Sequence, residues 1–390
     1  MNNPSPYNAN QNFPRPVAIK PRSSSGSVIK IILFVIAALV AVLLGLLVLL
    51  LIGFETGPVG FLIGLISATL PVPVYLMLVL WIDRYESEPY WMLASAFFWG
   101  ALVAVFFAFV INTASGIAVT IVTEDINAGN TFGAVISAPI VEEISKALIL
   151  FIFFFWKKDE FDGVIDGIVY AAMAGLGFAM TENIQYYGRA VLQGGGNALT
   201  FVFVLRGAVA PFSHPLFTSM TGIGLGLARQ SQNTLVKIIT PLMGLGAAIA
   251  LHTIWNGSVF LFGGAGFVVM YALIMFPAIC IIFVVIALSL HREGRVVREF
   301  LTPDFQGGVL TPQEYKQLGS IFGRMGASYN ALSKGGFQGW RASRQLNQTA
   351  SELAFHRSRV ARGLASADAH EREVAYRMAM EDLLRRLRSH

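Results

Sequence analysis

The stretch GAVISAPIVEEISKALILFIFFFW, residues 133–156, decides both the fold class and the candidate site of this chain. It is long and apolar enough to cross a lipid bilayer, yet it contains the adjacent acids Glu142 and Glu143. An ionisable side chain at bilayer depth costs about 2.5–3.5 kcal/mol on insertion scales. The i,i+4 spacing predicts a Glu142–Lys146 pair and leaves Glu143 without a local partner. Because a structural salt bridge needs only one glutamate, the pair predicts a functional site.

The composition is that of a membrane protein. Hydrophobic residues make up 55% of the 390 positions and charged residues 13%, against roughly 25% charged residues in soluble domains. Residues 1–290 carry 12 Lys/Arg and 13 Asp/Glu, whereas residues 291–390 carry 16 and 10. The positive net charge therefore belongs to the tail and does not indicate a nucleic-acid partner. The single cysteine, Cys280, excludes an internal disulfide and a zinc site built from cysteines.

Hydropathy predicts an all-α, polytopic bundle with about eight spans of roughly 20–30 residues. With the N-terminus inside, the inner loops hold five Lys/Arg, whereas the outer loops hold only Arg189. The positive-inside rule then places both termini in the cytoplasm and the protein in the cell membrane as a multi-pass protein. The expected spans lie at about 28–52, 59–81, 91–113, 132–156, 164–188, 199–228, 236–261 and 266–290.

The chain is expected to have three parts. Residues 1–27 are rich in Asn, Pro and Ser and are predicted to be disordered. Residues 28–290 form the transmembrane domain, and residues 291–390 form a basic, soluble and largely helical tail. In the tail, Thr311 and Glu314 have capping-box spacing, and the glycines at 335–339 predict a break. The last segment, from about 346 to 389, is an interfacial helix on anionic lipid, a helix for a cytoplasmic partner, or a solvated tail.

Polar side chains recur on the three spans that follow the glutamate pair. Glu182 and Asn183 lie in the fifth span, and His214 lies in the sixth. His252 and Asn256 in the seventh span are four residues apart, so they share one helix face. These residues are candidate partners of the glutamates.

Helix rise gives the depth of these groups. At about 1.5 Å per residue, Glu142, Glu182 and His252 lie roughly 10–15 Å below the outer ends of their spans, and His214 about 22 Å below. All four therefore fall between the outer interface and just past the midplane, which predicts one polar chamber that opens outward. Asp166 lies about 24 Å from Glu182 along the same helix and is expected outside that chamber.

Two kinds of chemistry suit such a chamber. Neighbouring carboxyl groups in a dry environment can exchange a proton near neutral pH, as a general base must. Alternatively, Glu182, His214 and His252 hold a zinc ion, and a second glutamate deprotonates the bound water. The short zinc motif with two histidines on one helix is absent, so a metal site would be assembled from separate helices. No Ser-His-Asp or Cys-His arrangement is apparent.

Four motifs in order carry a family resemblance: Glu142-Glu143-x-x-Lys146, Phe178-x-x-x-Glu182-Asn183, His214 followed by Gly222-Ile-Gly224, and His252-x-x-Trp255-Asn256. Together they resemble the PrsW family of intramembrane proteases, which is related to CAAX prenyl-protease and bacteriocin-immunity-type membrane proteases. Any one motif is weak, but four on consecutive apolar helices are specific. The resemblance covers about residues 70–290 and leaves the basic tail outside.

The resemblance implies hydrolysis of a peptide bond of a membrane-anchored protein near the extracytoplasmic side, with a single-pass anti-sigma factor as the specific substrate class. It makes Glu142 and Glu143 the catalytic pair, without deciding which is the base. The remaining residues that it implies are Glu182, His214, His252 and Asn256 in the site, with Lys146 and Asn183 in support. Lys146 is expected to neutralise one carboxylate, while Asn183 and Asn256 are candidate oxyanion donors.

Two rival classes remain. A proton-coupled transporter also uses intramembrane Glu and His residues, but it should show repeats and paired broken helices in its two halves. Here the ionisable residues gather in spans four to seven. A non-catalytic scaffold or immunity-type protein would keep the fold and cleave nothing; the intact motifs argue against it.

Overall fold

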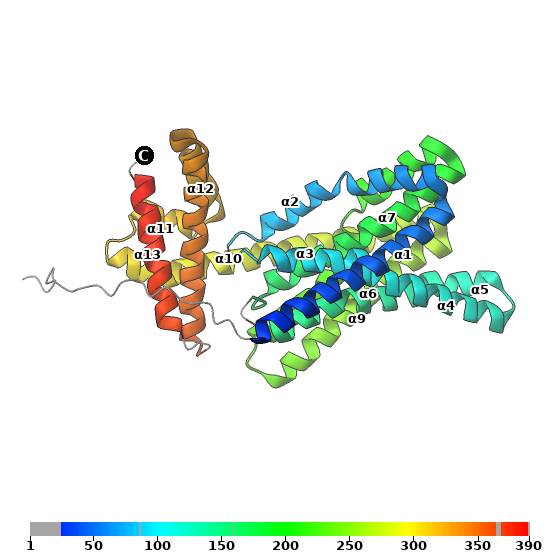
Figure 1. Ribbon diagram of the computed structural model, residues 1–390, viewed down its shortest axis with the longest axis horizontal. Coiled ribbons are helices and arrows are strands. Elements are labelled where there is room, and N and C mark those ends of the chain that lie inside the picture. Colours follow the sequence, from blue (N-terminus) through cyan, green and yellow to red (C-terminus); the bar gives the residue numbers. More distant parts are fainter. Residues whose placement is uncertain (1–24, 86, 159, 364–367, 389–390) are drawn as a thin grey trace, which may run out of the picture. The chain divides into compact units, whose positions relative to one another are not determined.

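The computed structural model describes residues 25–388 except 86, 159 and 364–367, and every regular element in this part of the chain is helical (Figure 1). The predicted disordered segment, residues 1–27, lies almost entirely outside the described residues. The described residues up to Leu43 belong to one compact unit, and those from Leu44 onward form a second, which contains the candidate site and the tail.

The elements before the tail are α-helices (α) interrupted by short π-helical segments (η). They are α1 (Ser25–Thr69), α2 (Val72–Ile82), α3 (Tyr90–Phe98), η1 (Trp99–Ala104), α4 (Val105–Thr123), α5 (Ile126–Phe132), η2 (Gly133–Ser137), α6 (Ala138–Trp156), α7 (Val164–Phe203), η3 (Val204–Val209), α8 (Ser213–Gln230), α9 (Thr234–Met270), η4 (Tyr271–Met275) and α10 (Phe276–Gln306).

Long apolar helical stretches make this a polytopic membrane protein, as predicted. Helix α6 is not one of the candidate spans, because Glu142, Glu143 and Lys146 place three charges in its 19 residues. The predicted number of eight spans therefore stays a prediction. Five stretches of the described residues are long and apolar enough to cross a membrane: Ile32–Ile82, Tyr90–Thr123, Val164–Gln230, Thr234–Ser258 and Phe260–Gln306.

Glycines interrupt three of these long stretches at the junctions between predicted spans. Gly57, Gly195 and Gly263 have φ values of 66°, 62° and 59°, a left-handed conformation that side chains disfavour. The chain folds back at the last of them: a Cβ on Gly266 would lie 2.3 Å from the carbonyl oxygen of Ser258. In a straight helix, residues eight apart are separated by about 12 Å.

Helices α6 to α9 pack closely against one another and carry the candidate site. Helix α7 contacts α6 and α8, and α9 contacts α6 and α8. The first half of α7 is buried almost throughout. A Cβ on Gly175 would lie 2.6 Å from the Pro215 backbone nitrogen and 2.8 Å from the His214 carbonyl carbon. The missing side chain therefore lets α7 approach the first turn of α8, where His214 is located.

The tail continues from α10 and contains α11 (Pro312–Leu318), α12 (Ile321–Ala361) and α13 (Ala369–Arg388). The predicted capping box is confirmed: Thr311 N donates to Glu314 Oε2 at 2.8 Å, and Glu314 N donates to Thr311 Oγ1 at 3.2 Å. The predicted break falls at Gly336, where φ is 58°. Leu353 of α12 and Leu301 of α10 belong to one buried cluster, so the tail packs on the end of the last membrane helix.

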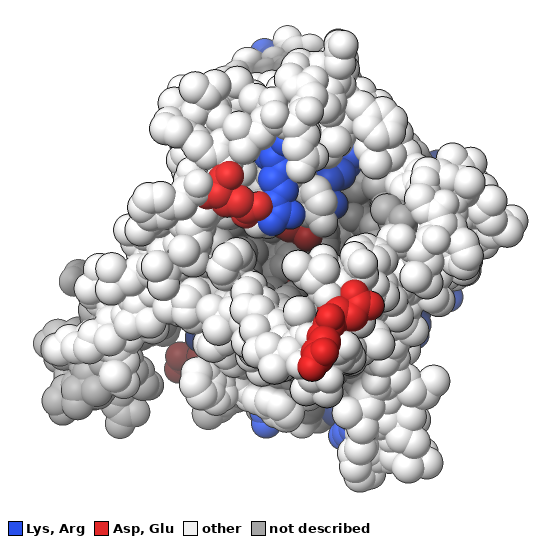
Figure 2. All heavy atoms as spheres, turned by 90° about the vertical axis from the view of Figure 1, so that its right-hand side faces the viewer, with Lys and Arg blue, Asp and Glu red and all other residues white. Residues whose placement is uncertain are grey.

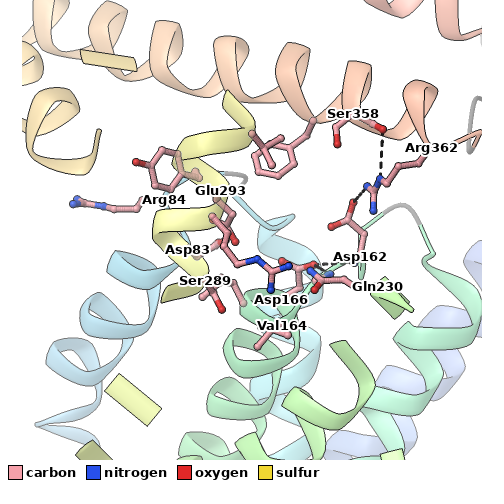
Figure 3. A pocket seen from close by; sticks show the side chains of 16 residues that line it. Asp83, Arg84, Asp162, Val164, Asp166, Gln230, Ser289, Glu293, Ser358 and Arg362 are labelled. Carbon is pink, nitrogen blue, oxygen red and sulfur yellow. Dashed lines mark hydrogen bonds and ion pairs between the residues drawn. The ribbon is translucent and has the colours of Figure 1, made fainter. Parts of the chain in front are cut away.

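A polar cavity of about 270 Å³ lies where the tail meets the helix bundle (Figure 3). Its walls include Asp83, Asp162 and Asp166 from the bundle and Arg362, which directly follows α12. Asp162 Oδ2 lies 3.5 Å from Arg359 Nη1 and 3.7 Å from Arg362 Nη2. Asp166 accepts hydrogen bonds from two backbone N–H groups just before α7. It therefore lies at the tail end of the bundle and not among the histidines.

Candidate active site

Glu143 is completely buried, with 0% of its surface exposed, and both of its carboxylate oxygens are occupied. Lys146 Nζ donates to Oε1 at 2.5 Å, and Thr218 Oγ1 donates to Oε2 at 2.9 Å. His252 Nδ1 lies 3.0 Å from Oε1. Three neighbours on α6, α8 and α9 thus fix this carboxylate, which makes it the structural centre of the site.

Glu142 has the opposite environment. It is buried too, but its Oε2 accepts no hydrogen bond from the described residues. That oxygen lies 3.8 Å from Nε2 of His252. Glu142, His214 and His252 each offer one ligand atom within 4.8 Å of the other two. The sequence places Glu182 in the metal-binding set with the histidines; the structure brings Glu142 to that position.

The predicted pairing of Lys146 was wrong. The sequence favours Glu142, four residues earlier, but the ammonium group contacts Glu143, three residues earlier. Both spacings put side chains on neighbouring helix positions. The contacts beyond α6 decide between them: Lys146 Nζ also lies 3.1 Å from His214 Nδ1 and 4.4 Å from the centre of the Phe178 ring. These groups lie on the side of α6 that Glu143 faces.

Glu182 lies at the edge of the site and forms an ion pair with Arg206. Arg206 Nη2 donates to its carboxylate, and Arg206 Nε donates to Asn183 Oδ1 at 2.6 Å. The same Glu182 oxygen lies 2.9 Å from His214 Nε2. The Glu182 side chain is 21% exposed, and its partners Arg206, Asn183 and His214 line the cavity beside the site. Its contact with His214 links it to the group of Glu142, His214 and His252.

The contacts of the two histidines indicate their tautomers. Lys146 carries only donor hydrogens, so His214 Nδ1 accepts from it and Nε2–H donates to Glu182. For His252, Nδ1–H donates to the Glu143 carboxylate, which leaves Nε2 with a free lone pair on the side of Glu142. The ring of Phe217 stacks on His252 at 4.8 Å and limits its rotation.

A cavity of about 310 Å³ adjoins these groups. Asn256 and Asn183, the two candidate oxyanion donors, both line it. Asn256 Nδ2 donates to the Ala134 carbonyl oxygen at 3.0 Å, and Asn183 binds Arg206 through its oxygen. Figure 2 shows the end of the molecule away from the tail; most of this face is uncharged, and acidic and basic side chains gather around a hollow.

The donor set fits a metal ion. Carboxylate and imidazole groups are the usual ligands of zinc at catalytic sites. Of the three residues, Glu142 has an oxygen, Oε2, with no hydrogen-bond partner among the described residues, and His252 presents Nε2 at 3.8 Å from that oxygen. Both ring nitrogens of the third, His214, have protein partners. Metal binding there would replace one of these contacts. Glu143 accepts a hydrogen bond from His252. A carboxylate in this position typically orients a histidine that binds a metal.

Two neighbours of the site lie outside the set of site residues predicted from the sequence. Thr218 lies four residues after His214 on the same face of α8 and donates to Glu143. That i,i+4 spacing was a usable signal. Arg206 lines the cavity and binds Glu182 and Asn183. It lies in η3, and its direction depends on how α7 continues into η3, which the sequence does not indicate.

Comparison with known proteins places these residues in a family. Residues 88–284 match the model of the PrsW family of intramembrane metalloproteases. The Protease PrsW of Geobacillus kaustophilus is 33% identical over 167 residues, which cover 43% of this chain and 67% of that protein. The Protease PrsW of Oceanobacillus iheyensis is 27% identical over 233 residues, 60% of this chain and 97% of that protein. The Bacillus subtilis Protease PrsW is 33% identical over 152 residues, 38% and 61% of the two chains.

No solved structure is significantly similar to the chain. The family match contains all eight predicted site residues, from Glu142 to Asn256, and ends before the basic tail. The buried Glu142, His214 and His252 agree with a metal-dependent hydrolase. This chain therefore belongs to the PrsW family of intramembrane metalloproteases.

Proposed function

We propose that this protein is an endopeptidase that hydrolyses a peptide bond of a membrane-anchored protein near the extracytoplasmic side of the membrane. The observation that carries the proposal is the buried group of Glu142, His214 and His252, in which one carboxylate oxygen has no hydrogen-bond partner among the described residues. A buried, unpaired acceptor is costly, and a site that binds a cation removes this cost. The cavity of about 310 Å³ beside the group gives an extended peptide segment room to enter.

The proposed topology has eight spans, with both termini cytoplasmic. Left-handed glycines at the junctions between predicted spans support this number, and the excess of Lys/Arg in alternate loops supports the orientation. The three-part division into residues 1–27, 28–290 and 291–390 belongs to the same proposal. It is supported by the family match, which ends at residue 284. In this topology the cavity faces the extracytoplasmic side and the tail lies in the cytoplasm.

We assign the metal-holding role to Glu142, His214 and His252, with zinc as the ion that best suits one carboxylate and two imidazoles. A zinc ion would supply Lewis acidity, which activates water and polarises the carbonyl group of the scissile bond. The assignment differs from the sequence-based set in one member, since Glu182 is already bound to Arg206. The structure offers Glu142 in its place.

The remaining side chains position groups and move a proton. Glu143 accepts the Nδ1–H of His252 and so directs Nε2 towards Glu142. Glu182 lies beside His214 and is partly exposed, so we propose its carboxylate as the group that takes a proton from the attacking water and passes it to the leaving amine. Asn256 lines the cavity and supplies a donor for the oxyanion. Lys146 neutralises Glu143.

The proposed substrate is a single-pass membrane protein, and an anti-sigma factor is the specific candidate implied by the family resemblance. The test is cleavage in proteoliposomes that contain the purified protein and such a substrate, with zinc measured by elemental analysis. Wild type should cleave and a chelator should stop it. Glu142→Gln should lose both zinc and cleavage, whereas Glu182→Gln should keep zinc and lose cleavage.

Glu143→Gln tests the proposed role of Glu143 in positioning His252 and leaves the three proposed metal ligands in place. A carboxylate that accepts a hydrogen bond from a metal-binding histidine typically contributes about 10–100-fold to metal affinity or activity. The zinc affinity or the cleavage rate of this variant should therefore fall by that factor. Undiminished cleavage by the Glu142 and Glu182 variants would sink the site assignment. Cleavage without zinc in the wild type would remove the metal and leave the glutamates as the catalytic groups.

A further inference from the structure

Helix α12 exposes large apolar side chains although it belongs to the soluble tail. Phe322, Tyr329 and Phe337 are 83%, 71% and 68% exposed, and Met325 and Leu332 are exposed as well. On a soluble surface, scattered apolar residues need no explanation, but a contiguous apolar patch indicates a binding surface. These residues recur at spacings of three to five positions along one helical hairpin.

The hairpin arises because α12 folds back at Gly336. A Cβ on Gly339 would lie 2.3 Å from the Ala331 carbonyl oxygen, and Ser328 Oγ lies 3.1 Å from Ser343 Oγ. Its two arms are therefore antiparallel and pack along a line of small residues. The ring of Phe337 stacks on Trp340 at 5.4 Å near the turn.

Helical periodicity places both sets of exposed residues on the same side of the hairpin. At about 100° per residue, the exposed residues of each arm point about 110° away from the residues of that arm that face the other arm. The rotation has the same sense in both arms. Because the arms run in opposite directions, equal rotations point to one side. The surface so formed, called the hairpin surface below, consists of Phe322, Met325, Tyr329, Leu332, Phe337, Trp340, Arg341 and Arg344.

The charge of this segment has one sign. From residue 315 to residue 351 the sequence contains five Lys/Arg and no Asp or Glu. Arg341 and Arg344 are exposed, and the Arg344 guanidinium lies 5.2 Å from the centre of the Trp340 ring. Aromatic residues and Trp in particular gather at membrane interfaces, and each Lys or Arg near an anionic membrane adds about 1 kcal/mol of attraction.

Helix α10 connects the tail to the membrane-spanning part of the chain and so keeps the tail next to a membrane. Helix α10 runs without a break from a candidate span to Gln306 and packs against α12, and Figure 1 shows α12 running across the direction of α10. The opposite side of α12 is buried against the rest of the tail through Leu346, Ala350 and Leu353. The hairpin surface is therefore the side left for another partner.

From these observations we infer that the hairpin surface docks on the anionic phospholipid headgroups of the leaflet from which α10 emerges. The aromatic rings enter the interfacial region, and Arg341 and Arg344 contact the lipid phosphates. This differs from the interfacial helix at about 346–389, one of the three alternatives left open by the sequence, because Leu353, Met380 and Leu384 of that segment are buried in the tail. The inference does not depend on the protease activity.

A site-specific fluorophore tests the inference in the full-length protein. Cys280→Ser removes the only cysteine, and Tyr329→Cys then carries an environment-sensitive dye. The matched control places the dye at Glu371, an exposed position of α13. In nanodiscs that contain phosphatidylglycerol and a headgroup-labelled nitroxide lipid, the dye at 329 should be quenched several-fold more than the dye at 371. In phosphatidylcholine alone the difference should shrink.

Arg341→Glu combined with Arg344→Glu should abolish the extra quenching at 329 in the anionic nanodiscs. The inference is overturned if the dye at 329 stays as water-exposed in anionic nanodiscs as the dye at 371. It is equally overturned if the burial of the dye at 329 is independent of lipid charge and increases with the number of protein copies per nanodisc. A second copy of the protein would then cover the surface.

Discussion

At the residue scale, the two adjacent glutamates have different surroundings, and the separate tasks proposed for them rest on that difference. Glu143 has three partners on three helices, whereas Glu142 Oε2 has no hydrogen-bond partner among the described residues. A carboxylate with partners on both oxygens holds its neighbours in place, while a carboxylate with a free oxygen can bind something new. The sequence places both acids in one motif and does not distinguish these tasks.

Thr218 offers a test of this arrangement that leaves every proposed ligand intact. Thr218→Val keeps the shape but removes the hydroxyl that donates to Glu143 Oε2, and an unsatisfied buried carboxylate costs about 1–3 kcal/mol. We expect a lower unfolding temperature and weaker metal binding. Thr218→Ser, which keeps the donor, should stay close to the wild type. A loss confined to the Ser variant, with the Val variant unchanged, would show that the methyl group matters and not the hydrogen bond.

At the scale of elements, the contact between α7 and α8 sets the position of His214. The approach depends on Gly175, where an added Cβ would lie 2.6 Å from the Pro215 nitrogen. Backbone atoms cannot move aside as a flexible side chain can, so the first turn of α8 must shift. Small residues allow such close approach of helices in membranes.

Gly175→Ala should therefore reduce cleavage at least tenfold, since displacements of about 1 Å at a catalytic group can cost on the order of 100-fold. The measurement is the rate of substrate cleavage in proteoliposomes, together with the zinc content. Gly246→Ala is the matched control, because a Cβ on this α9 glycine meets no atom within 4 Å. If the two variants behave alike, the close approach of α7 does not position His214.

At the scale of the whole molecule, the cavity between bundle and tail makes stability depend on pH through Asp83. This residue is 5% exposed and lies outside the candidate spans. Burial raises the pKa of Asp83 from 3.8 to about 7; the Glu88 N–H opposes this effect and the charge of Asp166 adds to it. The folded state therefore favours protonated Asp83, and stability is lost as the pH rises from about 4 to about 7.

Asp83→Asn removes this dependence and keeps an acceptor for the Glu88 N–H. The pKa difference corresponds to roughly 4 kcal/mol at full ionisation. We expect the variant to unfold at a higher temperature than the wild type near pH 8 and to lose that advantage near pH 4. The difference in unfolding temperature across this range is the measurement. An advantage that does not change with pH would contradict the assignment.

Much of this architecture could be predicted from the sequence. Hydropathy indicated the membrane helices, and the spacing of Thr311 and Glu314 indicated the start of α11. The partners of Lys146 and the position of Glu142 beside the two histidines could not be predicted in the same way. They depend on how far α6 and α7 are rotated about their axes, and the packing of glycines such as Gly175 against another helix decides that rotation.

The ion pairs of Asp162 with Arg359 and Arg362 have a thermodynamic consequence. Asp162 lies in the connection between α6 and α7, the two helices that carry the three glutamates. A ligand of the tail that changes these ion pairs changes the energy of that connection. Linkage is reciprocal, so a substrate that moves α6 against α7 must alter the tail's affinity for its own ligand by the same factor.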